Sequence, residues 1–268
     1  MTHCNLWQRL EYCLGLLVTA AAIGLAAGDA AAPLYAAGQQ APSEDVLEYG
    51  NIVNEAALKG DPTMLAAARL NLKSMMSAAE GPTDLRLLYY TAGYASWEFS
   101  LQAGDDANAR GAILDAAAQL KESLLFDSRY TEAHILRAIV HAQLLKLTGG
   151  SVPYDPAIGA SLAQLASREP RNPRAVLATG IVAFLAPEAF SKTAADAEQA
   201  LKSAQILFAA EPDNRPWPSW GKAQTEAWLG QVLAKKGDMA GARQAYQRAL
   251  ALHAGYAWVT DVLMPALK

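Results

Sequence analysis

The sequence predicts an all-α fold built from helical hairpins. Of its 268 residues, 52% are hydrophobic and only 18% are charged, a balance typical of folded rather than disordered chains. Much of the apolar content is alanine, the strongest helix former, and β-branched residues nowhere cluster in the alternating runs typical of strands. Short breaks rich in Gly, Pro and Asp divide the chain. Ten helices between these breaks are expected to pair into five hairpins.

The first thirty residues have the pattern of an export signal. Arg9 precedes an apolar stretch from Leu14 to Ala27, and the small residues that follow suit cleavage after Gly28 or Ala30. The apolar run is shorter than the roughly 20 residues that span a membrane. We therefore expect a signal peptide at 1–30, with an uncleaved N-terminal anchor as the alternative.

The rest of the chain is expected to be free of cysteine chemistry. Both cysteines, Cys4 and Cys13, lie inside the signal segment, which leaves no disulfide, thiolate metal site or cysteine nucleophile beyond it. Residues 31–44 have no apolar period and are expected to form a flexible leader. We assign the helical domain to residues 45–268.

Each expected helix starts after a break, where Pro and Asp suit the first turn. The first hairpin is expected at 45–79, and a shorter segment from Tyr256 to Leu267 is expected to close the stack as a C-terminal capping helix. The breaks inside the five hairpins fall, in chain order, at Gly60 to Pro62, Gly104 to Asp106, Gly149 to Pro156, Ala186-Pro187 and Gly237-Asp238; the last four hairpins end at Ser128, Pro170, Pro212 and Ala254.

The fifth hairpin carries the clearest motif. Its first helix contains Leu229-Gly230, and its second helix places Ala242, Tyr246 and Ala249 on one face. This pattern resembles the tetratricopeptide repeat, in which a Leu-Gly pair is followed by Ala, an aromatic residue and Ala at helical spacing. Weaker copies precede it, with Gly93 in the second hairpin, Ala138 in the third and Gly180 in the fourth.

The resemblance implies a right-handed α-α superhelix with a concave groove. Small residues such as Gly93, Gly180 and Gly230 would let the partner helix approach, while Leu120 and Tyr246 would fill the gap. A hairpin with apolar surface on both sides cannot bury it alone, so neighbouring hairpins are expected to stack.

In tetratricopeptide proteins the first helix of each hairpin lines the groove, and the resemblance places a partner-binding surface there. Carried over by alignment on the small residue, the groove residues are Tyr90, Tyr94, Trp97, Glu98, Ile139, Arg174, Phe184, Gln231 and Lys235. An apolar, aromatic floor with few charges suits an extended peptide or helix from a partner protein.

Two alternatives remain open for the aromatic residues. Tyr94, Trp97 and Phe184 have the helical spacing of residues that pack between adjacent hairpins, so they are either groove contacts or core. The insertion Arg215-Pro-Trp-Pro-Ser-Trp220 is either a second contact surface or a plug over the edge of the superhelix.

No constellation in the sequence points to catalysis, a cofactor or a metal. His134 and His141 are two helical turns apart, roughly 10 Å, which is too far to share one ion without a third element. His253 suits a helix C-terminus, and Asp105-Asp106 is explained as an N-terminal charge pair. With a net charge of −4 and no dense basic cluster, nucleic-acid binding is not expected.

The resemblance and the export signal together predict a non-catalytic scaffold or assembly factor of a Gram-negative cell envelope. It would be periplasmic and would hold a segment of a partner protein in the groove, within a larger envelope complex. If the N-terminal segment stays uncleaved, it would be an adaptor anchored in the inner membrane and facing the periplasm, and only then would it contact the membrane. The alternative function is that of a ligand-binding accessory protein of a transport system. An enzyme would need convergent ionisable groups with shifted pKa values in one cleft.

Overall fold

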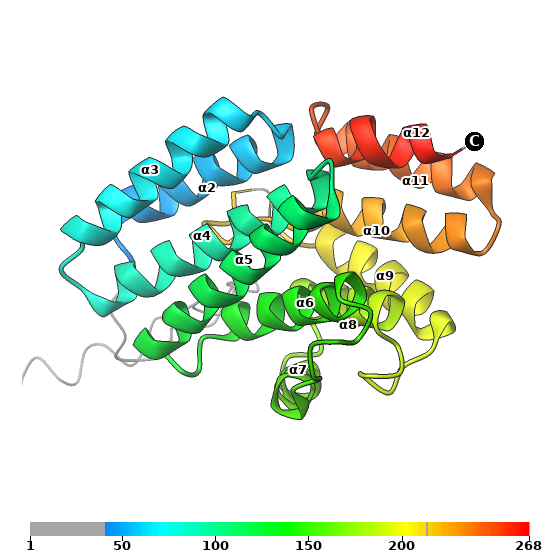
Figure 1. Ribbon diagram of the computed structural model, residues 1–268, viewed down its shortest axis with the longest axis horizontal. Helices are drawn as coiled ribbons and strands as arrows, with labels where there is room; N and C mark the ends of the chain where they lie inside the picture. The colour runs from blue at the N-terminus through cyan, green and yellow to red at the C-terminus, as the bar shows by residue number, and fades with distance from the viewer. Residues whose placement is uncertain (1–40, 213, 268) are drawn as a thin grey trace, which may run out of the picture. The chain divides into compact units, whose positions relative to one another are not determined.

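The computed structural model describes residues 41–212 and 214–267, and all regular structure within these ranges is helical (Figure 1). The long helices are α2 (Glu44–Lys59), α3 (Pro62–Ala78), α4 (Pro82–Gln102), α5 (Asp106–Phe126), α6 (Thr131–Leu147), α7 (Pro156–Arg168), α8 (Pro173–Leu185), α9 (Ala194–Ala209), α10 (Lys222–Lys235) and α11 (Met239–Leu252). A π-helical turn, η1 (Trp258–Leu263), and the short α12 (Met264–Ala266) follow. The all-α prediction is confirmed for this part of the chain.

The expected export signal and most of the expected leader, residues 1–40, lie outside the described residues. Residues 41–43 are irregular, and α2 begins at Glu44, one residue earlier than the sequence analysis assigned. No described helix is long and apolar enough to cross a membrane.

The predicted breaks act as helix N-caps. The Asp61 carboxylate accepts hydrogen bonds from two backbone N–H groups at the start of α3, at 2.8 and 3.1 Å. Asn172 caps α8 in the same way, and Asp105 caps α5. Thr193 forms a reciprocal capping box with Asp196 at the start of α9. Each cap satisfies N–H groups that would otherwise lack a partner, so the break residues fix where these helices begin.

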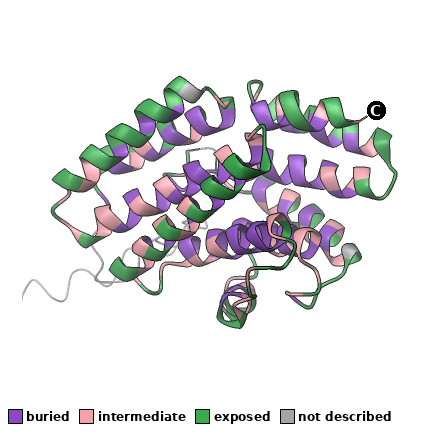
Figure 2. Ribbon diagram, viewed as in Figure 1, coloured by how far each residue is buried: buried purple, intermediate pink, exposed green. Residues whose placement is uncertain are grey.

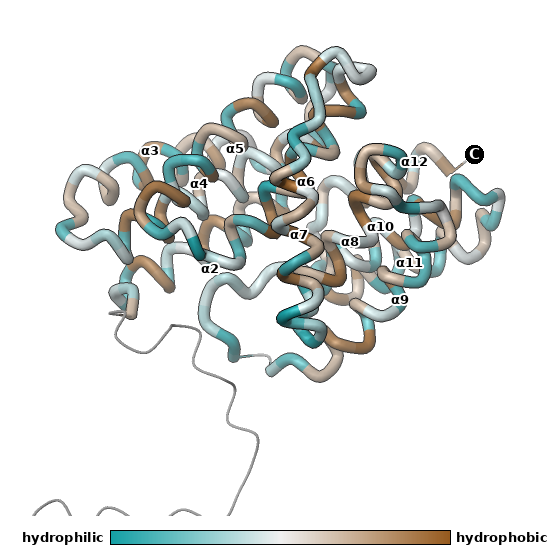
Figure 3. The backbone as a smooth tube through the Cα atoms, turned by 90° about the horizontal axis from the view of Figure 1, so that it is seen from below, coloured by the Kyte–Doolittle hydropathy of each residue, from teal (hydrophilic) through white to brown (hydrophobic). Residues whose placement is uncertain are grey.

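The helices pack as neighbouring pairs that also contact the next pair. The first helices form a continuous row, because α2 contacts α4, α4 contacts α6, α6 contacts α8, and α8 contacts α10. Each second helix packs against its own partner and against the first helix that follows it. The first helices are accordingly the more deeply buried, as the purple ribbons of α4, α6, α8 and α10 show (Figure 2). Along most other helices hydrophobic and hydrophilic residues alternate (Figure 3), as expected for helices that bury one side.

One contact recurs in three of the pairs and sets the close approach of their helices. A Cβ atom added at Gly93 would lie 2.8 Å from Leu120 Cγ, and one added at Gly180 would lie 2.7 Å from Leu201 Cγ. At Gly230 the added atom would lie 2.1 Å from Tyr246 Cε1. The predicted packing of small residues against large ones is therefore present in the second, fourth and fifth pairs.

The third pair departs from this arrangement. Its small residue is Ala138, and eight residues, 148–155, separate its helices. Helix α7 buries Ile158, Leu162 and Leu165 against α6 and α8, but it makes no substantial contact with α5. Figure 1 shows α7 standing apart from the other second helices. On α5, the side chains of Leu114 and Leu125 are exposed.

The C-terminal segment packs against the start of the domain as well as against α11. Helix η1 contacts α4, and the buried Tyr256 hydroxyl lies 3.4 Å from the Glu98 carboxylate of α4. His253 Nε2 lies 2.9 Å from Glu55 of α2. The first and last pairs of the domain are thus in contact.

The glycine contacts predict opposite effects for two Gly-to-Ala changes. Gly230→Ala should lower the free energy of unfolding by about 1–3 kcal/mol, because the new methyl group overlaps Tyr246. Gly111→Ala in α5 should raise it by about 0.5–1 kcal/mol, because a Cβ there meets nothing within 4 Å and alanine is the better helix former. Urea unfolding followed by circular dichroism measures both. Equal effects of the two changes would contradict the packing described for Gly230.

Candidate partner-binding site

Most of the residues expected on an open groove are inside the protein. Tyr90, Tyr94, Trp97, Glu98, Ile139 and Arg174 each have an exposed fraction of 0%. Phe184 and Gln231 are half-buried, and Lys235 is exposed. The interpretation of the first six side chains as an exposed groove floor is therefore corrected: in this structure another part of the chain already covers them.

Four of them, Tyr90, Tyr94, Trp97 and Arg174, are covered by the Pro- and Trp-rich insertion, which we call the Trp segment (residues 214–221). Trp217 is 0% exposed and Trp220 is 2% exposed. The Trp217 ring lies 5.1 Å from that of Tyr94, and the Trp220 ring lies 5.4 Å from that of Trp97. Such tilted and edge-to-face pairs are favourable aromatic contacts. Of the two alternatives left open by the sequence, the structure shows the packed one for Tyr94 and Trp97.

Every indole N–H of this aromatic cluster is satisfied. Trp217 Nε1 donates to Thr91 Oγ1 at 2.8 Å, and Trp220 Nε1 donates to the Tyr90 hydroxyl at 2.6 Å. Trp97 Nε1 donates to Gln143 Oε1 of α6 at 3.1 Å. Because buried donors without partners are costly, these bonds fix the Trp segment in one position on α4.

A buried charge network holds the beginning of the Trp segment. The Arg174 guanidinium binds the Glu211 carboxylate through two nitrogens, at 2.7 and 3.1 Å. Arg215 also binds Glu211, at 2.7 Å, and approaches Glu132 at 3.4 Å. Two cations and two carboxylates therefore balance inside the protein, as buried charges require. Arg174, expected as a groove cation, is committed to this network.

Glu98 lies at the junction of α4, α10 and the C-terminal segment. Gln224 Nε2 donates to Glu98 Oε1 at 2.8 Å, and the hydroxyls of Tyr94 and Tyr256 each lie 3.4 Å from a carboxylate oxygen. Burial raises the pKa of Glu98 from 4.5 to about 7, and these three hydrogen bonds oppose that rise. The carboxyl group therefore titrates near neutral pH inside the core.

The part of the expected groove that stays accessible is a small cationic and aromatic site. The Lys146 ammonium lies 5.4 Å from the centre of the Phe184 ring, and the Lys235 ammonium lies 5.2 Å from the same centre. We call Lys146, Phe184 and Lys235 the lysine–phenylalanine site. Neither lysine has an ion pair or a hydrogen bond with any of the described residues.

Three consecutive first helices build this site at their C-terminal ends. Lys146 lies in the last turn of α6, Phe184 in the last turn of α8, and Lys235 ends α10. Each lysine is individually favoured there by the negative end of its helix dipole. Loss of water around the Lys146 ammonium and, second, the positive charge of Lys235 lower the pKa of Lys146. Two like charges thus share one aromatic ring without a counter-ion from the described residues.

The site continues inward onto two tryptophan rings. The Trp228 ring lies 6.1 Å from that of Phe184 and 4.9 Å from that of Trp258. The Trp228 indole N–H is buried and has no hydrogen-bond partner among the described residues. Sequence analysis identified Phe184 and Lys235 but missed Lys146, whose place in the last helical turn was the available signal.

The remaining ionisable candidates have separate structural roles. His134 Nε2 lies 2.8 Å from the Ser128 carbonyl, and His141 Nε2 accepts the backbone N–H of Asp155 at 3.0 Å. Asp105 accepts the backbone N–H of Asn108 as an N-cap. Among the described residues there is no group of three or more His, Cys, Asp or Glu side chains that could hold a metal ion.

Comparison with known proteins gives no match to a protein-family model and no match among curated proteins. The resemblance to tetratricopeptide repeats therefore depends on the motif residues and the helix contacts of this chain alone.

The two aromatic environments predict different costs of truncation. Trp97→Ala should lower the free energy of unfolding by about 3–5 kcal/mol, because it removes a fully buried indole. Phe184→Ala should cost clearly less, because that ring is half-buried. Urea denaturation of both variants measures the difference. Small, equal losses would instead indicate that Trp97 is not part of the core.

Glu98 predicts a pH dependence of stability. Its pKa in the folded state, about 7, lies above the ordinary value of 4.5, so its contribution is complete below about pH 4.5 and is lost as the pH rises through about 7. Between these limits the free energy of unfolding should fall by about 3 kcal/mol relative to Glu98→Gln. Denaturant titrations across the pH range test this, with the exposed Glu188→Gln as control. Parallel pH profiles of Glu98→Gln and the unsubstituted protein would contradict it.

Proposed function

We propose that this protein is a non-catalytic interaction scaffold of the bacterial cell envelope, built as a tetratricopeptide-like superhelix, and that it binds a partner protein at the lysine–phenylalanine site. The observation that carries the proposal is the convergence of Lys146 and Lys235 on the half-exposed Phe184 ring. A ring flanked by two ammonium groups offers an apolar contact and positive charge within one small area.

The chemistry of the site favours an acidic partner segment. A carboxylate placed between the two ammonium groups would relieve their mutual repulsion and form charge-assisted hydrogen bonds. An apolar side chain next to that carboxylate could pack on the Phe184 ring. The best fit is therefore a segment with an Asp or Glu beside an apolar residue, and binding should weaken as salt screens the charges.

The burial of most of the expected groove residues favours a scaffold that binds its partner on a surface rather than in a deep groove. The Trp segment takes the place of a peptide against α4, and its two indole groups and Arg215 are committed to internal bonds. A partner therefore meets a preformed surface at the helix ends. A rigid surface of this kind loses little conformational freedom on binding.

The superhelix and the location are parts of the same proposal. Each second helix contacts the first helix that follows it, and three pairs share the small-against-large contact, as expected for stacked repeats. The export-signal pattern in the first thirty residues supports a periplasmic location, with an inner-membrane anchor as the alternative.

Site-specific photo-crosslinking in cells of the source organism tests the proposal. A photoreactive phenylalanine placed at Gln231, on the same face of α10 as Lys235, should crosslink a discrete partner. The same probe at the exposed Lys73 of α3 should not. The double change Lys146→Glu and Lys235→Glu should abolish the crosslink by reversing the charge of the site.

The control for that double change is Lys73→Glu with Lys192→Glu, which alters the net charge equally at two exposed positions elsewhere. It should leave the Gln231 crosslink intact. A crosslink that survives reversal at the site, or that both double changes remove equally, would contradict the proposed binding site.

A further inference from the structure

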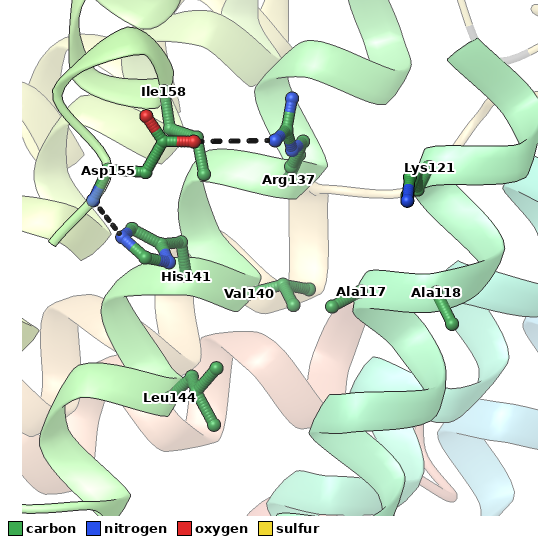
Figure 4. A pocket seen from close by; sticks show the side chains of 9 residues that line it. All are labelled: Ala117, Ala118, Lys121, Arg137, Val140, His141, Leu144, Asp155 and Ile158. Carbon is green, nitrogen blue, oxygen red and sulfur yellow. Dashed lines mark hydrogen bonds and ion pairs between the residues drawn. The ribbon is translucent and has the colours of Figure 1, made fainter. Parts of the chain in front are cut away.

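A pocket of about 340 Å³ opens between α5, α6 and α7 (Figure 4). It shares helix α6 with the lysine–phenylalanine site but has no lining residue in common with that site. Its walls are mainly apolar, with Val140 and Leu144 from α6, Ile158 from α7, and Ala117 and Ala118 from α5. The volume falls at the small end of the range of natural ligand pockets, roughly 300–1,000 Å³.

The pocket lies where α7 packs loosely. Helix α7 packs less closely on its partner α6 than the second helices of the second, fourth and fifth pairs pack on theirs, and it makes no substantial contact with α5. Part of the α5 surface is exposed: Leu114 is 51% exposed and Leu125 is 69% exposed. Together with Ala118 and Lys121 these residues are three or four positions apart, so they form one stripe on the helix that passes the pocket.

His141 contributes one directed polar group to this apolar space. Its Nε2 accepts the Asp155 backbone N–H, so the proton of the neutral ring is on Nδ1. Figure 4 shows this second nitrogen on the side of the ring away from Asp155, and it has no hydrogen-bond partner among the described residues. Burial lowers the pKa of His141, which keeps the ring in this neutral, donating form.

The rim of the pocket carries an excess of positive charge. Lys121 is exposed and forms no ion pair within the described part of the chain. The Arg137 guanidinium lies 3.6 Å from the Asp155 carboxylate, and both side chains are more than one-third exposed, so this ion pair is loose. The same carboxylate caps α7 by accepting the Ala157 N–H at 2.9 Å. The two cations at the rim, Lys121 and Arg137, therefore have only the Asp155 carboxylate beside them, and that carboxylate already caps α7.

We propose that this pocket binds a small monocarboxylate with an apolar body. The apolar walls would hold the body, while the carboxylate would accept the His141 Nδ1–H and lie within reach of Lys121 and Arg137. One N–H donor beside two cations matches a carboxylate better than an amine or a neutral alcohol, because such hydrogen bonds are charge-assisted. The proposal does not depend on the partner-binding function above.

Octanoate is a suitable probe, with octylammonium and octan-1-ol as matched ligands of the same chain length. Titration into the ¹⁵N-labelled protein should shift backbone amide signals of α5, α6 and α7 saturably for octanoate. Octan-1-ol should bind more weakly and octylammonium should not saturate these signals. Octylammonium binding as tightly as octanoate, or shifts located on other helices, would overturn the proposal.

Two variants test separately how the apolar body of the ligand and its charge contribute to binding. Ala117→Leu places a larger side chain where Figure 4 shows Ala117 pointing toward Val140, and it should abolish octanoate binding. Lys121→Gln, at an exposed position that should not disturb folding, should weaken binding about fivefold through loss of one ion pair. The control is Lys73→Gln, an exposed lysine of α3, which should leave the affinity unchanged. Equal affinities for Lys121→Gln and Lys73→Gln would show that the rim charge plays no part and would overturn the assignment.

Discussion

The burial of two tryptophans from one irregular segment organises the whole row of first helices. Trp217 and Trp220 are among the largest fully buried side chains of the described residues. Their contacts join α4 to residues more than one hundred positions later in the chain. Trp217 also approaches α2 so closely that a Cβ at Gly50 would lie 2.3 Å from its ring. Since truncating a buried aromatic costs about 3–5 kcal/mol, this segment is an integral part of the core.

Polar groups inside this core follow from the same burial. Glu98 of α4 and Arg174 of α8, whose guanidinium lies over the Trp220 ring, are both fully buried and need partners within the protein. Arg174 obtains them from Glu211, and Glu98 obtains them from Gln224 and two tyrosines. Of the Glu98 partners, Gln224 and Tyr256 come from the last pair and the C-terminal segment, far along the chain from α4. These polar contacts therefore help to specify how α4 and the last pair are placed, whereas apolar contacts alone would tolerate sliding.

Local pattern was enough to predict the helices and their pairing, but not what covers them. The breaks, the caps and the Gly-against-large contacts act over a few residues or between adjacent helices. Sequence periodicity and turn chemistry report on these directly. The side of α4 that holds Tyr94 and Trp97 is covered by a loop far along the chain, and helical spacing is the same for a core residue and a groove residue.

Lys146 and Phe184 meet only because α6 and α8 end at the same level. The loose packing of α7 had one local signal, since Ala138 stands in the third pair where the second, fourth and fifth pairs have glycine.

The two surface sites occur where regular stacking is interrupted, and this explains their chemistry. Between packed helices the buried faces are covered by a neighbour, so an uncompensated charge there would be too costly to keep. At the ends of α6, α8 and α10 the ring of Phe184 reaches solvent, and lysines can stay charged beside it. Between α5, α6 and α7 the loose packing of α7 on α6 leaves apolar surface next to Lys121 and Arg137. In stacked repeats each helix pair buries apolar surface against the next pair. Exposed apolar area and unbalanced charge can therefore occur together where the stacking is loose or where the helices end. Binding to another molecule needs both.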